Sequence, residues 1–175
     1  MKKIVTGVLA LGVVLGSGSS FASADELDSV SQNGNTIQSI SASTTKSITA
    51  SQFSKVYAAM KKYEGTPYKY GGNSPKTGFD CSGLMQWGYE TQGIKLPRTA
   101  QDQYDKTTRI DRKALQPGDL VFFKGTVSGK SGITHVGMYI GDNKFYNASS
   151  SNGVSEASLN SSYWSKYIAG YGRVK

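Results

Sequence analysis

The stretch GFDCSGLMQWGYE, residues 78–90, contains the only cysteine of this 175-residue chain. Asp80 is a favoured N-cap residue and Gly93 a common C-terminal stop, so the sequence predicts a helix over residues 81–93. Its apolar side would consist of Leu84, Met85 and Tyr89. Cys81 would then lie at a helix start, where unpaired backbone N–H groups converge.

The position of Cys81 suggests a reactive thiol. A thiol attacks as the thiolate, and a helix N-terminus and a neighbouring imidazolium both lower the thiol pKa. The same N–H groups can stabilise the oxyanion that forms when a thiolate attacks a carbonyl. The alternative is a small apolar core residue, as most single buried cysteines are, although a polar, glycine-flanked setting is a poor core position. Gly83 and Gly88 also weaken the local helix preference, so something must pack closely against them.

The only histidine, His135, lies in GITHVGMYIGD, residues 132–142. It is the side chain that exchanges protons near neutral pH without a large pKa shift, so it is the candidate general base for Cys81. A third polar group should orient its ring, and Asn147 is the best candidate. The alternative for His135 is a strand histidine whose hydrogen bonds are satisfied within the fold. The alternative for Asn147 is an ordinary polar residue beside a turn.

A predicted hairpin decides whether His135 and Asn147 meet. Residues 143–149 follow the first strand across a tight turn, which would place residues near 138 and 147 opposite each other. The two side chains share a face only if the turn holds an odd number of residues or a bulge shifts the register. Gly141 would allow such a bulge.

The first 24 residues have the pattern of a secretory signal peptide: two lysines, an apolar run and a small-residue ending. We expect cleavage before Asp25. The alternative is an uncleaved membrane anchor, but the apolar run is shorter than the ~20 residues that span a bilayer, so we expect no stable membrane anchor. Residues 25–50, rich in Ser and Thr, should form a flexible tail or linker. The protein would be secreted, extracellular or associated with the cell wall, with a free thiol.

Residues 51–175 read as one folded domain of the α+β class. Further helices are predicted over 51–65, where Ser51 or Ser54 can act as the N-cap, and over 98–107. Residues 66–80 form a loop with two prolines and three glycines. Strands are predicted over 118–125, 132–141, 143–149 and 167–175.

The charge of residues 51–175 is strongly positive, with 17 Lys/Arg against 9 Asp/Glu, a net +8. Such a surface favours polyanions, and for an exported protein these would be anionic wall polymers. The alternative is a charge that only keeps the protein soluble. We expect no nucleic-acid partner, since there is no basic cluster or aromatic RNA-binding motif. One cysteine and one histidine do not make a zinc site, so we expect no metal and no cofactor.

Four motifs occur in sensible order: GTPYKYGGNSPKTGFDCSGLMQW (65–87), LPRTAQDQY (96–104), LQPGDLVFF (115–123) and THVGMYIGDNKFYNAS (134–149). Together they resemble the NlpC/P60 family of secreted bacterial cell-wall cysteine peptidases, over roughly residues 52–174. The resemblance implies a papain-like core in which the cysteine opens a helix that packs on an antiparallel sheet carrying the histidine. It also implies cleavage of peptidoglycan stem peptides, typically at the bond from γ-D-glutamate to the diamino acid.

The resemblance also implies roles for residues. Cys81 would be the nucleophile and His135 the base. Asn147 takes a third position that is most often histidine in this family, and an asparagine can hold the ring as papain-type sites do.

Tyr68, Asp80 and Ser82 match positions that bind substrate in this family. Tyr68 would lie beside the thiol. Asp80 and Ser82 would recognise a free amino terminus on the stem peptide, since a carboxylate suits an ammonium. The competing interpretation of Asp80 is a helix cap alone.

Two rival functions stay open. The same cysteine and histidine could serve an amidase or acyltransferase. Alternatively, the chain could be a wall-binding protein with weak catalysis, an interpretation supported by the absent third histidine. In each case we expect a monomer.

Overall fold

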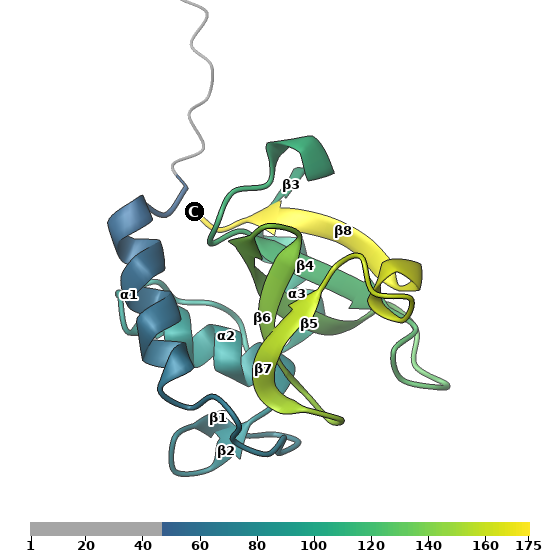
Figure 1. Cartoon of the computed structure of the whole chain (residues 1–175), viewed down its shortest axis with the longest axis horizontal. Helices are drawn as coiled ribbons and strands as arrows, with labels where there is room; N and C mark the ends of the chain where they lie inside the picture. The colour runs from purple at the N-terminus through teal and green to yellow at the C-terminus, as the bar shows by residue number, and fades with distance from the viewer. Residues whose placement is uncertain (1–46) are drawn as a thin grey trace, which may run out of the picture. The chain divides into compact units, whose positions relative to one another are not determined.

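The protein's structure, a computed structural model, describes residues 47–175 (Figure 1). The predicted signal peptide, and the predicted tail up to residue 46, lie outside the described residues and stay predictions. The elements in chain order are α1 (Ala50–Lys61), β1 (Asn73–Ser74), β2 (Gly78–Phe79), α2 (Cys81–Glu90), α3 (Ala100–Lys106), β3 (Thr108–Ile110), η1 (Arg112–Ala114), β4 (Leu120–Lys124), β5 (Ile133–Gly141), β6 (Lys144–Ser149), β7 (Gly153–Ser158), η2 (Trp164–Lys166) and β8 (Ile168–Arg173).

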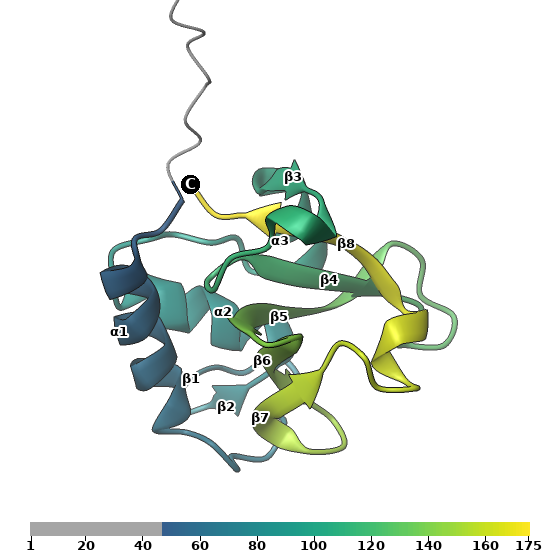
Figure 2. The ribbon, with the colours of Figure 1, turned by 45° about the horizontal axis from the view of Figure 1, so that its top comes forward.

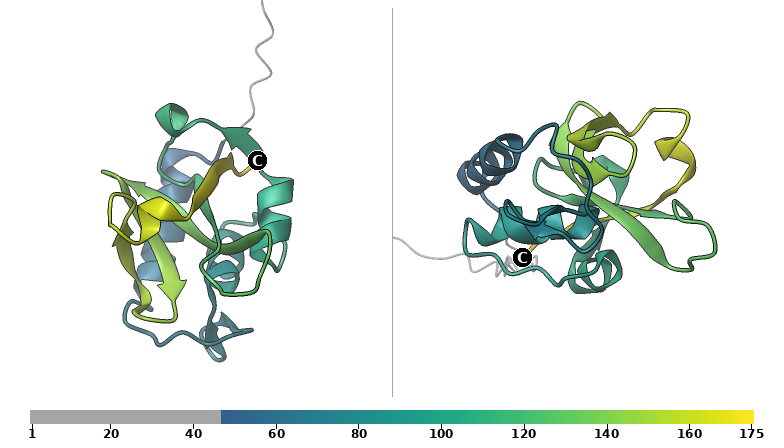
Figure 3. Two further views of the ribbon diagram at one scale, coloured as in Figure 1. Left: turned by 90° about the vertical axis from the view of Figure 1, so that its right-hand side faces the viewer. Right: turned by 90° about the horizontal axis from the view of Figure 1, so that it is seen from below.

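Six of the strands form one antiparallel sheet in the order β3-β8-β4-β5-β6-β7. The helices α1 and α2 pack against each other on one side of it, and α2 contacts β5 and β6 (Figures 2 and 3). The short strands β1 and β2 pair separately, immediately before α2. Helices thus come first and antiparallel strands later, which confirms the predicted α+β class.

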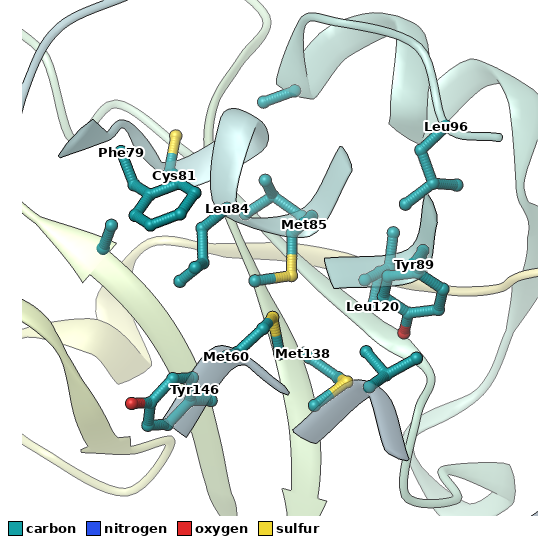
Figure 4. Close-up of a cluster of buried hydrophobic side chains, with 14 of the residues drawn as sticks. Met60, Phe79, Cys81, Leu84, Met85, Tyr89, Leu96, Leu120, Met138 and Tyr146 are labelled. Carbon is teal, nitrogen blue, oxygen red and sulfur yellow. The ribbon is translucent and has the colours of Figure 1, made fainter. Parts of the chain in front are cut away.

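The two faces of the β5–β6 hairpin have different surroundings. On one face, Val136, Met138, Tyr146 and Ala148 belong to a buried core with side chains of α1 and α2 (Figure 4). On the other face, Phe145 packs in a second cluster with Phe123 and Trp164. His135 is on this second face, because its ring lies against Phe123 and Trp164. The strand alternation therefore places one apolar set of side chains against the helices and puts His135, with Phe145, on the opposite face.

The glycines of α2 are explained by close packing. A Cβ at Gly83 would overlap the backbone of Gly72, and one at Gly88 would lie 2.6 Å from the sulfur of Met60 in α1. A Cβ in either place would force the neighbouring segment to move. The prediction that something packs closely at these two positions is confirmed.

The strand and helix predictions are confirmed within a few residues, with three exceptions. The N-cap of α1 is Thr49, which forms a capping box with Gln52, so the prediction of Ser51 or Ser54 is wrong. The helix ends at Lys61 and not near Gly65. The strands β1, β2, β3 and β7 were not expected. Residues 66–80 were predicted to form a loop, and GVSEAS in β7 has the composition of a linker and gains its place by pairing with β6.

Candidate active site

Cys81 is the first residue of α2, as predicted, and Asp80 is its N-cap. The Gly83 N–H donates to Asp80 Oδ1 at 2.7 Å. The cysteine lies at the edge of the apolar core, and its sulfur points away from Leu84 and Met85 (Figure 4). The residue is 7% exposed and lines a surface groove. The thiol is therefore shielded but open to a molecule in the groove.

The carboxylate of Asp80 is fully occupied by neighbours. Arg98 donates to both of its oxygens, and the Gly71 N–H donates to Oδ2 at 3.0 Å. These partners hold the pKa of Asp80 below its usual value, although burial acts the other way. Asp80 is thus a helix cap and one half of an ion pair. An incoming ammonium would have to compete with Arg98 for it.

Ser82 and Tyr68 lie beside this pair. The Ser82 hydroxyl donates to Asp80 Oδ1 at 3.2 Å and accepts from Arg98 Nη1 at 3.0 Å. Tyr68 lines the same groove, and burial, with the charge of a Cys81 thiolate, raises its pKa to about 12. Its phenol stays protonated near neutral pH and can donate a hydrogen bond. Sequence reasoning missed Arg98, although it lies in the LPRTAQDQY motif.

On the opposite wall of the groove, two hydrogen bonds fix the His135 ring and the Asn147 amide. His135 Nε2 and Asn147 Oδ1 are 3.1 Å apart, and both side chains are buried. Asn147 Nδ2 donates to the Ser155 carbonyl in β7 at 3.1 Å, so its oxygen faces the ring. Because that oxygen only accepts, Nε2 carries the proton and Nδ1 is the basic nitrogen. The unexpected strand β7 thus sets the orientation of the predicted third residue.

A bulge brings His135 and Asn147 to the same face, as the hairpin required. Met138 pairs with Tyr146, and the register shifts between Tyr139 and Gly141. Residue 147 therefore lies opposite residue 137, one position from the expected pairing. A Cβ at Gly137 would lie 3.2 Å from Asn147 Cβ and 2.5 Å from the Phe145 ring. The missing side chain leaves room for Asn147 to reach His135.

Trp164 covers the ring of His135. The two rings are stacked, with centroids 4.8 Å apart and an interplanar angle of 29°. Phe123 contacts both of them, with its centroid 5.7 Å from the imidazole. Nothing in the local sequence around Trp164 pointed to this contact, because the tryptophan comes from a 3-10 helix 29 positions after the histidine.

The groove is large enough for a peptide. It has a volume of about 1220 Å³, above the ~300–1,000 Å³ of a pocket for a drug-sized ligand. Cys81, His135, Tyr68, Asp80 and Ser82 all line it, whereas Asn147 lies behind the histidine. The exposed large hydrophobic residues of the described chain are Tyr70, Val127 and Tyr163, and all three line this groove. Such a concentration of exposed apolar groups is typical of a binding surface.

Comparisons with known proteins identify the family of this chain. A sequence profile described as the NlpC/P60 family matches residues 65–173. The chain belongs to the NlpC/P60 family. It is 51% identical over 114 residues to the bifunctional muramidase/DL-endopeptidase CwlT of Bacillus subtilis. It is 40% identical over 119 residues to the gamma-DL-glutamyl hydrolase of the same species.

Solved structures of NlpC/P60 proteins have the same fold. One is the crystal structure of a Staphylococcus aureus protein of the NLP/P60 family, named as similar to a lipoprotein. It matches this chain with a TM-score of 0.70 and 43% sequence identity. It covers 74% of this chain and 43% of that one. The two Bacillus subtilis matches cover 65% and 67% of this chain, which spans 34% and 28% of those proteins. The papain-like NlpC/P60 fold predicted from the sequence is thereby confirmed.

The electrostatics of this NlpC/P60 site favour uncharged groups. Burial raises the pKa of Cys81 to about 11, with a further contribution from the Asp80 carboxylate. The N–H groups of Val136, Ser82 and Cys81 lower it, but by less. Burial lowers the pKa of His135 to about 4, against the hydrogen bond to Asn147. The helix start therefore acts in the predicted direction, while burial outweighs it, and at neutral pH the groove holds a thiol and a neutral imidazole.

Residues 47–175 contain no group of three His, Cys, Asp or Glu side chains that could hold a metal ion. No helix among these residues has the length and apolar character required to cross a bilayer.

Proposed function

We propose that this chain is an endopeptidase of peptidoglycan stem peptides that cleaves the bond from γ-D-glutamate to the diamino acid. The observation that carries the proposal is the hydrogen bond between His135 Nε2 and Asn147 Oδ1. It leaves Nδ1 as the basic nitrogen in a groove that the Cys81 thiol also lines. The names of the two Bacillus subtilis relatives, a DL-endopeptidase and a gamma-DL-glutamyl hydrolase, support this choice of bond.

The proposed reaction begins with a proton transfer. Nδ1 of His135 takes the thiol proton as the Cys81 sulfur attacks the amide carbonyl. The unpaired N–H groups at the start of α2, with the Tyr68 phenol, stabilise the oxyanion. His135 then protonates the leaving amine, which yields a thioester on Cys81. Water, activated by His135, hydrolyses the thioester and restores the thiol.

Asn147 would act through the histidine. Its oxygen accepts a hydrogen bond from the Nε2–H group and stabilises the imidazolium that forms during attack. Asp80, Ser82 and Arg98 would form one polar wall beside the thiol, where the amino terminus of a stem peptide can bind the Ser82 hydroxyl and compete for Asp80.

The Cys81 thiol and the His135 imidazole are both neutral before substrate binds. Within the described residues, the Cys81 sulfur makes no hydrogen bond to the His135 ring. We infer that the hydrogen bond between thiol and imidazole forms only when substrate binds, as in many sites whose hydrogen bonds tighten only in the complex. The same pKa shifts support the second candidate function, a wall-binding protein with weak catalysis.

Digestion of defined stem peptides separates these functions. Wild type should release a fragment with a new amino terminus on the diamino acid, detected by mass spectrometry, and Cys81→Ala should release none. Equal release by Cys81→Ala would refute the assignment of the nucleophile. Free lactyl ends would indicate an amidase, transferred acyl groups an acyltransferase, and binding without any cleavage the wall-binding protein.

Export and wall association belong to the same proposal. A secreted monomer with a net charge of +8 over residues 51–175 would reach the anionic wall by attraction between charges. Co-sedimentation with purified walls should then fall as salt rises, since salt screens exposed charges. Sedimentation that does not change with salt would count against this attraction.

A further inference from the structure

The charges that line the groove are mostly neutralised within the protein. Four formally charged side chains line it: Asp80, Arg98, Lys130 and Glu156. Asp80 and Arg98 form an ion pair with each other. Glu156 accepts hydrogen bonds from Tyr57 and from lysines 61 and 144.

Lys130 is different. Lys130 has no ion-pair partner among residues 47–175. The other three charged side chains that line the groove each have one within this range. A ligand in the groove therefore meets one positive charge that the protein does not compensate. A carboxylate is the ligand group that such an ammonium binds best, through a charge-assisted hydrogen bond.

The loop that carries Lys130 is held close to His135. It joins β4 to β5 and extends beyond the ends of these strands (Figure 2). At its base, the Thr126 and Thr134 hydroxyls are 2.7 Å apart, and Thr134 is the residue before His135. The Ile133 N–H donates to Gln101 Oε1 in α3 at 2.8 Å. The loop is thus fixed on both sides of its base, while Lys130 itself is exposed.

The proposed substrate has a carboxylate near its reacting carbon. A γ-linked D-glutamate uses its side-chain carboxyl in the scissile amide, so its α-carboxyl remains outside the peptide linkage. Only the two side-chain methylenes and the α-carbon separate that group from the attacked carbonyl. A second carboxylate lies at the C-terminus of the leaving peptide. If either group is amidated, the charge that would bind Lys130 is lost.

We propose that Lys130 binds a carboxylate of the stem peptide and makes the groove select the free acid over the amide. This inference rests on the proposed function, since that function supplies the substrate class. Lys130 would set specificity and take no part in bond cleavage. It would distinguish stem peptides by the charge state of one carboxyl group.

Binding measured in the Cys81→Ala background tests the proposal without turnover. Two pairs of stem peptides are needed: one pair differs only in the D-glutamate α-carboxyl (acid or amide), the other only in the terminal carboxyl. We expect about fivefold tighter binding of the acid in one pair, the upper size of an ion pair at an exposed lysine. That pair identifies the carboxylate. Adding Lys130→Met should remove the preference, and Lys130→Glu should reverse it.

The control variant is Lys113→Met, because Lys113 is exposed and lies outside the groove. It should keep the full preference. The proposal is wrong if the Cys81→Ala parent shows no preference in either pair, or if the preference survives Lys130→Met. Cleavage of the acid peptides by wild type is measured separately, so a failure of the proposed function would be seen as no cleavage while the binding ratios still report on Lys130.

Discussion

The two walls of the groove hold their candidate catalytic residues by different interactions. On the Cys81 wall, the Asp80 carboxylate binds Arg98 and two backbone N–H groups, so charge and hydrogen bonds fix the helix start. On the His135 wall, the Asn147 amide oxygen accepts a hydrogen bond from the ring N–H, and aromatic rings cover the imidazole.

One wall therefore fixes the position of the Cys81 thiol, and the other sets the protonation state of the His135 ring. The ion pair under α2 fixes where the thiol lies, and its own charges largely compensate each other. The neutral, apolar surroundings of His135 instead determine the charge of the ring, because burial is the main cause of its lowered pKa. Breaking the first wall should therefore cost mainly stability, whereas breaking the second should mainly change a titration.

The largest effect is expected from Asp80→Ala. This change removes the N-cap of α2, worth ~1 kcal/mol, and leaves Arg98 without its partner, which costs ~3 kcal/mol. The second figure is the low end of its range, because the Arg98 side chain is 34% exposed and can reach water. We expect the free energy of unfolding, measured with urea at neutral pH, to fall by about 4 kcal/mol.

Asp80→Asn is the matched control for this prediction. It keeps an oxygen that can cap the helix but loses the charge, so its loss should be about 3 kcal/mol, smaller by the ~1 kcal/mol of the cap. If both the alanine and the asparagine variant were as stable as wild type, neither the charge nor the cap of Asp80 would stabilise the start of α2.

The second effect is a pH dependence of stability that comes from His135. Its pKa is about 4 in the folded protein, below the ordinary 6.5 of an unfolded chain, so the folded state binds fewer protons. The stabilisation is complete above pH 6.5 and is lost as pH falls toward 4. Between pH 7 and pH 4, wild type should lose about 3 kcal/mol more than His135→Gln.

Urea unfolding of both proteins at several pH values measures this difference. Asp80 and Glu156 have lowered pKa values and also lose stability in acid, but they contribute equally to wild type and variant and cancel. Parallel stability curves for the two proteins would contradict a buried, neutral His135.

The sequence predicted the parts of this site that local chemistry determines. A residue favourable for capping before a lone cysteine indicated the helix start, and Gly141 indicated the bulge that the hairpin needed. It did not predict two contacts between distant segments. Arg98 reaches Asp80 across 18 positions, and Asn147 is oriented by Ser155 in a strand whose composition is that of a linker. The thiol pKa was also out of reach, since burial depends on the packed fold.

The smallest effect in stability, and the sharpest test of the second wall, is Trp164→Leu. Leucine keeps an apolar cover but loses the aromatic stacking on His135, worth about 1 kcal/mol. It also lets water approach the ring, so the pKa of His135 should rise from about 4 toward its ordinary value. Proton NMR measures this directly, because the chain has a single histidine.

Tyr163→Leu is the control. Tyr163 is 48% exposed, and its ring contacts Trp164 and Tyr167 but not the imidazole, so the pKa of His135 should not move. An unchanged pKa in Trp164→Leu would mean that the rest of the fold, and not the tryptophan, keeps the imidazole neutral.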